Sequence, residues 1–119
     1  MDGEHHEEIM ALNTQIQMMR QQTNEQLGRG KEVFDTVIAG GKLQSTNKEH
    51  YLIEYYSVLR YEQYALWMSE YKDLTARLLT YLILQDMGKS DTEIQDILSI
   101  TYSSLRSIKT RLKAHLRLS

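Results

Sequence analysis

The stretch Gly88–Arg117, GKSDTEIQDILSITYSSLRSIKTRLKAHLR, decides how the chain folds. Gly88 stands where a helix C-cap glycine belongs. Ser90, followed three residues later by Glu93, matches the capping-box pattern S-x-x-E. The stretch therefore predicts a short helix over 91–98, a tight turn at Ser99-Ile100, and a longer helix that runs to about Leu118.

The predicted last helix has two different faces. One is an apolar stripe made by Leu105, Ile108, Leu112 and Leu116. The opposite face is small, polar and basic: Ser103, Arg106, Ser107, Thr110, Lys113 and Arg117, flanked by Lys109 and Arg111. Two helices joined by a short turn, the second with such a face, are typical of a helix-turn-helix. The alternative is an ordinary surface helix with a solvated polar face.

Charge is distributed unevenly along the sequence. The last 23 residues carry +5 and the first 96 carry −7, which together give the net charge of −2. A basic end on an acidic chain indicates an element that binds a polyanion. The preference of helix C-termini for cations also accounts for Lys113 and Arg117, but it does not account for Arg106 near the helix start.

The stretch from Gly88 to Arg106 resembles the LuxR-type helix-turn-helix pattern, G-x-S-[NT]-x-E-I-A-x-x-L-x-[IV]-[ST]-x-x-T-V-[KR]. Direct matches are Gly88, Ser90, Glu93, Ile94, Leu98, Ile100, Thr101 and Arg106, with Ser104 and Leu105 as chemically similar residues at the Thr-Val pair. The preceding Leu74-Thr75, Leu79 and Leu82 are similar to the opening helix of the family. The likeness covers about Leu74 to Leu116, and the whole chain resembles bacterial regulators that carry such a domain after a coiled coil.

This resemblance implies that the last helix enters the major groove of double-stranded DNA, with Arg106 on a base or phosphate. The candidate DNA-contacting residues are Thr101, Tyr102, Ser103, Ser104, Arg106, Ser107, Lys109, Thr110, Arg111 and Lys113. The family pairs through a fourth helix, for which little sequence remains after Arg117. We therefore expect upstream helices to form the homodimer.

Composition limits the other possibilities. The 119 residues contain no cysteine and no proline, and no apolar run is long enough to cross a bilayer. The acidic start MDGEHHEE is unlike a signal peptide, so we expect a cytoplasmic protein. Glycines separate segments of helical periodicity, and nothing alternates long enough to form a sheet. The chain is predicted to be all-α.

The N-terminal segment, 1–28, is predicted to form a coiled-coil helix. A spacing of 3-4-3 places Ile9, Leu12, Ile16 and Met19 on one seam, and we expect these residues to form the dimer contact. Packing back onto its own chain is the alternative. Gly28-Arg29-Gly30 is expected to break this helix before a second one over 31–39, whose core face would comprise Val33, Phe34, Val37 and Ile38.

The segment 29–72 is predicted to be a tyrosine-rich helical connector, ahead of a helix-turn-helix domain over 73–119. Ser45 or Thr46 would cap a helix from about Asn47 to Glu70, either continuous or bent, and Asp73 or Thr75 would cap the next. The tyrosines and Trp67 could form a platform for bases or a ligand pocket. With few basic residues nearby, packing of a core and a dimer interface is favoured.

No catalytic, metal or cofactor site is predicted. The adjacent His5 and His6 would project about 100° apart on a helix, which is poor geometry for a shared metal. The sequence also contains no pairing of nucleophile and base, and GRGK lacks P-loop spacing. We expect a non-enzymatic, sequence-specific DNA-binding transcriptional regulator or its output part. The alternative is a helical protein-interaction module in which the helix-turn-helix is only structural.

Overall fold

The computed structural model describes residues 24–117. Every regular element in this part of the chain is a helix, and the only ladder-type pairing is an isolated bridge between Tyr71 and Leu116. The all-α prediction is confirmed for these residues. The predicted dimer seam at Ile9, Leu12, Ile16 and Met19 lies outside them.

Residues 24–38 form one uninterrupted helix, so the predicted break at Gly28-Arg29-Gly30 is wrong. A Cβ on Gly30 would lie 2.4 Å from the Tyr51 carbonyl oxygen and 2.5 Å from Tyr55 Cβ. Gly30 is therefore a contact glycine that lets this helix approach the next one closely. Intrinsic helix propensity is a weak determinant that such tertiary packing overrides.

The core face predicted for this first helix is only partly correct. Val33 and Val37 are buried and Phe34 packs at the edge of the core, but Ile38 is 55% exposed. The helix ends near Gly40, whose φ of +85° is left-handed and suits glycine.

Two helices follow where one helix or a bent pair is predicted: α2 (Thr46–Leu59) and α3 (Tyr61–Glu70). Ser45 caps α2 by accepting a hydrogen bond from the Lys48 N–H. Arg60 interrupts the helical path between them with φ −121° and ψ 55°. The bend brings the rings of Tyr56 and Trp67 into a stack with centroids 6.1 Å apart, and both residues are buried.

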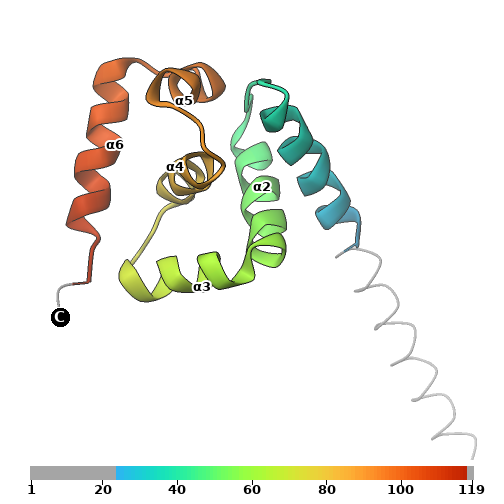
Figure 1. The fold of residues 1–119 in the computed structure, drawn as a ribbon, viewed down its shortest axis with the longest axis horizontal. Coiled ribbons are helices and arrows are strands. Elements are labelled where there is room, and N and C mark those ends of the chain that lie inside the picture. Colours follow the sequence, from blue (N-terminus) through green and yellow to red (C-terminus); the bar gives the residue numbers. More distant parts are fainter. Residues whose placement is uncertain (1–23, 118–119) are drawn as a thin grey trace, which may run out of the picture.

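The helix α4 (Ala76–Asp86) lies at the centre of the bundle and packs against α2, α5 and α6 (Figure 1). Thr75 is its N-cap, and every residue from Leu78 to Leu84 is buried. The helix is therefore buried all round and not along a single stripe. Thr80 is accommodated inside because its hydroxyl donates to the Ala76 carbonyl over 2.8 Å.

The last two helices are α5 (Asp91–Leu98) and α6 (Tyr102–Ala114). Gly88 has φ +82°, and Ser90 and Glu93 form the predicted capping box in both directions. Ser99 adopts a left-handed conformation at the C-cap of α5, and Thr101 caps α6. Local capping signals therefore define this part of the chain.

The chain beyond Ala114 does not continue α6 to Leu118 as predicted. The Lys72 N–H donates to the His115 carbonyl over 2.9 Å, and the Arg117 N–H donates to the Glu70 carbonyl over 2.8 Å. These bonds hold the end of the chain against the end of α3. Leu116, predicted to extend the apolar stripe, is consequently 39% exposed, whereas Leu105, Ile108 and Leu112 are buried as predicted.

Candidate nucleic-acid interface

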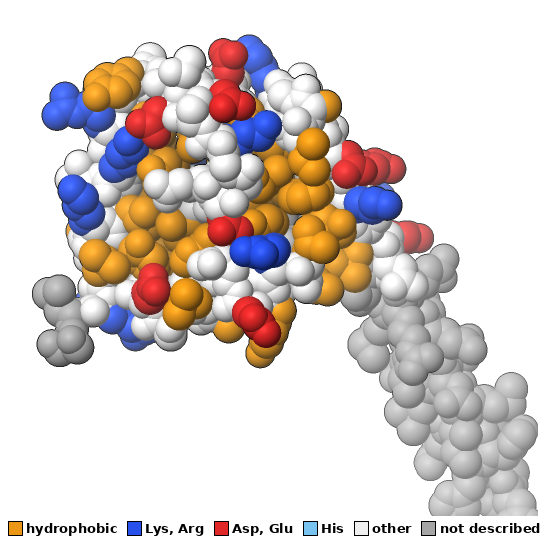
Figure 2. Space-filling view, viewed as in Figure 1, with side chains coloured by type: hydrophobic (Ala, Val, Ile, Leu, Met, Phe, Trp, Pro, Cys, Tyr) orange, Lys and Arg blue, Asp and Glu red, His pale blue; other side chains and the backbone are white. Residues whose placement is uncertain are grey.

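The outer face of α6 is an exposed edge of the molecule. Burial of Leu105, Ile108 and Leu112 against the bundle turns the opposite face of the helix outward. Lys and Arg side chains gather along this edge in the space-filling view (Figure 2). Of the ten candidate residues, all but Lys109 are exposed: Thr101, Tyr102, Ser103, Ser104, Arg106, Ser107, Thr110, Arg111 and Lys113.

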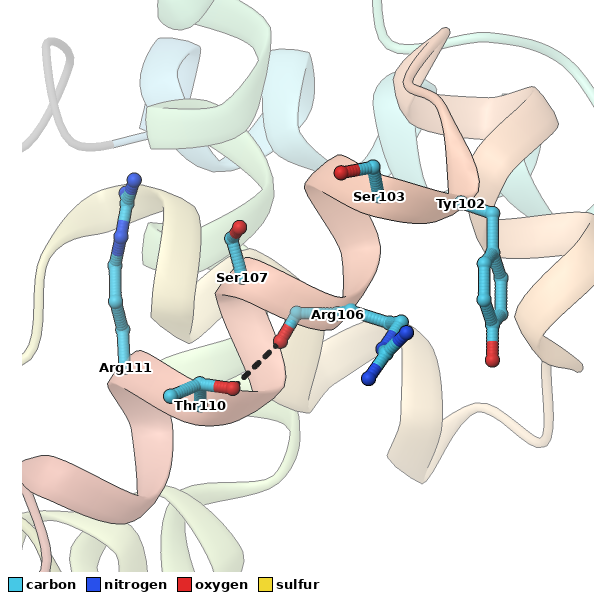
Figure 3. Close-up of a pocket in the computed structure, with 6 residues that line it drawn as sticks. All are labelled: Tyr102, Ser103, Arg106, Ser107, Thr110 and Arg111. Carbon is cyan, nitrogen blue, oxygen red and sulfur yellow. Dashed lines mark hydrogen bonds between the residues drawn. The ribbon is translucent and has the colours of Figure 1, made fainter.

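Six of these residues surround an open hollow of about 490 Å³ on the helix surface (Figure 3): Tyr102, Ser103, Arg106, Ser107, Thr110 and Arg111. They come from successive turns of α6, so the hollow follows the helix axis. The hydroxyls of Ser103 and Ser107 are short, which allows another backbone or a base edge to approach the helix closely.

Arg106 occupies the middle of this face. Its guanidinium carbon lies 6.0 Å from the centroid of the Tyr102 ring, at the outer limit of a cation–π contact. Its backbone carbonyl accepts a hydrogen bond from the Thr110 hydroxyl over 3.0 Å (Figure 3). The guanidinium itself forms no ion pair with the described residues, so its donors are available to an outside group.

The start of α6 uses two candidate residues for its own structure. The Thr101 side-chain oxygen accepts a hydrogen bond from the Ser104 N–H over 3.1 Å. The Thr101 hydroxyl also donates a hydrogen bond to the Ser104 hydroxyl. This N-cap sets the direction in which the helix leaves the turn. Thr101 therefore positions the start of α6, whether or not its side chain also contacts a ligand.

Lys109 differs from the other candidates because it is committed to a partner within the chain. Its ammonium lies 2.6 Å from the Asp91 carboxylate on α5. This hydrogen bond raises the pKa of Lys109 above its ordinary value. The sequence alone does not predict this pair, because the two residues are eighteen positions apart and no local periodicity relates them.

Within residues 24–117, no three His, Asp or Glu side chains come together as metal ligands would. Each helix of that region is too short or too polar to span a lipid bilayer. Comparisons with protein-family models, with curated proteins and with solved structures give no match to this chain.

Proposed function

We propose that this protein is a sequence-specific DNA-binding transcriptional regulator, or the output part of one, with α6 as the recognition helix. In this proposal α5, the turn at Ser99–Thr101 and α6 form the LuxR-type helix-turn-helix that the sequence resembles. The observation that carries the proposal is the exposure of the polar, basic face of α6. An interaction module with a merely structural motif could bury that face.

The chemistry of the face suits a duplex. Arginine can donate two parallel hydrogen bonds to a guanine edge or to a phosphate, and lysine pairs with phosphate as a point charge. Arg106, Arg111 and Lys113 are exposed and none pairs with a carboxylate in the described region. Serine and threonine between them permit close approach to the groove.

Two of the three acidic residues of α5 have partners within the chain, and the third, Asp96, is exposed. Asp91 is held by Lys109, and the Glu93 carboxylate accepts the Ser90 N–H over 3.1 Å. The same bond from Ser90 keeps the pKa of Glu93 low, which places its charge at the N-terminus of α5. Both of these carboxylates thus have partners within the chain.

In the proposed mode of action two copies bind half-sites spaced by about one turn of the double helix. Affinity depends strongly on salt, since each neutralised phosphate releases counterions. Charge on α6 supplies general affinity, and the side chains between Tyr102 and Thr110 supply base preference.

The test is retention on DNA of a chain carrying Arg106→Ala and Lys113→Ala. Fragments recovered from genomic DNA by the unmodified protein serve as the probe. We expect the double variant to lose retention while its circular dichroism and its oligomeric state stay unchanged. Each lost phosphate contact should also reduce the slope of log affinity against log salt by about 0.9.

The matched control is Lys31→Ala with Lys42→Ala, which removes the same charge from exposed positions elsewhere. This control should bind specific DNA nearly as well as the unmodified chain. Equal loss in both double variants would show that only net charge matters. If the α6 variant bound every fragment as well as the unmodified chain does, α6 would not be the recognition helix.

A further inference from the structure

The exposed large hydrophobic side chains of the described chain are concentrated at the junction of α2 and α3. Seven large hydrophobic side chains are exposed between residues 24 and 117, and four of them are Val58, Leu59, Tyr61 and Leu66. We call these four, with Arg60 and Glu62, the elbow surface. Contiguous exposed apolar patches with a polar rim are characteristic of interaction sites.

The bend at Arg60 explains why these side chains face outward. The inner side of the bend is filled by the stacked Tyr56 and Trp67, which are buried. Tyr56 donates to the Asp86 carboxylate, and Arg60 lies 3.5 Å from the same carboxylate. These contacts hold the junction to the end of α4, so the outer residues cannot turn inward.

The elbow surface is also hollowed. An open depression of about 540 Å³ is lined by residues 58–63 and Leu66. Tyr61, at 68% exposure, stands at this depression with its ring available to a partner. Tyrosine is enriched in the centres of protein interfaces because it combines a large apolar area with a polar end.

The charges of the elbow surface select the partner. Arg60 and Glu62 both line the depression and have opposite charges. Arg60 has its Nε 3.5 Å from Asp86, and its side chain is still 53% exposed. In a two-fold contact centred on this patch, the exposed part of Arg60 in one copy would face Glu62 of the other, and the reverse. We propose that the elbow surface is the contact between two copies of this chain.

Pairing at this surface leaves α6 free. The helix α3 runs from the elbow to the bridge between Tyr71 and Leu116, where the end of the chain is attached (Figure 1). Leu66, the member of the elbow surface nearest to the bridge along α3, lies five residues before Tyr71, or about 7.5 Å along the helix. The pairing surface thus serves the proposed function, but its test needs no DNA.

The first experiment measures self-association of the full chain carrying Leu66→Glu by sedimentation equilibrium. The matched control is Ile38→Glu, because Ile38 is also an exposed helical hydrophobic residue, 55% against 49% for Leu66. We expect Leu66→Glu to raise the dimer dissociation constant at least about tenfold. The control should change it by no more than about twofold.

The second experiment uses the absence of cysteine from the sequence. A Tyr61→Cys chain treated with a short bis-maleimide should yield a covalent dimer, whereas an Ile38→Cys chain should not. Circular dichroism of each variant checks that it folds. A monomer at all concentrations, or a dimer unaffected by Leu66→Glu with no Tyr61→Cys product, would overturn the proposal.

The two proposals fail separately. Loss of the dimer in Leu66→Glu supports the elbow surface whatever the DNA result. Loss of DNA retention in the α6 double variant, with its dimer intact, supports the recognition helix whatever surface pairs the copies.

Discussion

Lys109 Nζ donates a hydrogen bond to Asp91 Oδ2 over 2.6 Å, which ties the middle of α6 to the first turn of α5. The pair crosses the turn at Ser99–Thr101 and holds the angle between the two helices. Lys109 therefore braces the proposed recognition helix from behind, while Arg106 and Lys113 remain exposed on its outer face.

This brace should be weak but measurable. Both side chains remain partly accessible to solvent, 39% for Lys109 and 49% for Asp91, and solvent screens such pairs. A double-mutant cycle with Lys109→Met and Asp91→Asn should give a coupling of about 0.2–1 kcal/mol in urea unfolding. The coupling should shrink at about 1 M salt. A coupling that is unchanged by salt would contradict the ionic interpretation.

The pair should also respond to alkaline pH. Because the folded-state pKa of Lys109 is raised, its contribution is complete below the ordinary lysine pKa of about 10.4 and is lost as pH rises through the folded value. The coupling measured at pH 7 should therefore disappear in strongly alkaline buffer.

Gly30→Ala should destabilise the fold by about 1–3 kcal/mol. The new methyl group would lie 2.4 Å from the Tyr51 carbonyl oxygen, and that backbone atom cannot move without displacing α2. Gly28→Ala is the matched control, since no atom lies within 4 Å of its Cβ position. In the control, higher helix propensity should stabilise the chain by about 0.5–1 kcal/mol. Thermal unfolding of the two variants should thus shift in opposite directions.

The capping box at α5 should make the fold sensitive to acid. The hydrogen bond from the Ser90 N–H lowers the pKa of Glu93 in the folded chain. The stability that this bond contributes is therefore present above the ordinary glutamate pKa of about 4.3, and it is lost as pH falls through the lower folded-state pKa. Glu93→Gln retains an acceptor but cannot titrate. Urea unfolding at pH 7 and pH 3 should show a smaller loss in this variant than in the unmodified chain.

Ser90→Ala removes the other half of the same motif. Loss of the bond from the Glu93 N–H to the Ser90 hydroxyl should cost about 1 kcal/mol at neutral pH. If both substitutions left the acid response unchanged, carboxylates other than Glu93 would have to account for it.

Arg77 should matter more at neutral than at acidic pH. It lies 3.1 Å from Glu49, which is only 5% exposed, and burial raises the pKa of Glu49 while Arg77 opposes the rise. Because the pKa of Glu49 is raised, Glu49 favours the folded state most when it is protonated. When Glu49 is ionised, the Arg77 guanidinium offsets the cost of burying the carboxylate charge. Arg77→Met should therefore cost about 1–3 kcal/mol at pH 7 and less at pH 4. Adding Glu49→Gln should recover part of the cost and remove the pH dependence.

Most helix ends could be predicted because their signals are local. Ser45, Ser90 and Thr101 cap helices by bonding to N–H groups three residues ahead, and Gly88 supplies a left-handed turn. The apolar stripe of α6 likewise follows from helical periodicity, as do the buried Ile94, Ile97 and Leu98 of α5. Such interactions span a few residues, so the sequence contains them directly.

The errors arise where distant segments meet. Gly30 looks like a helix breaker until Tyr51 and Tyr55 are placed against it. The end of α6 cannot be found from periodicity, because residues 115–117 bond instead to the chain around Tyr71. The outward-facing apolar residues beside Arg60 also follow from no local signal, since the bend at Arg60 contains neither glycine nor proline.

By itself, then, the sequence determined the helical class, the capping box of α5 and the polar face of the last helix. Only the tertiary structure decided that this face is exposed, that Lys109 is paired with Asp91, and that the apolar residues beside Arg60 face outward. Capping and periodicity act within a few residues along the chain. Exposure and ion pairing depend on which distant segments pack together, and no local pattern encodes that.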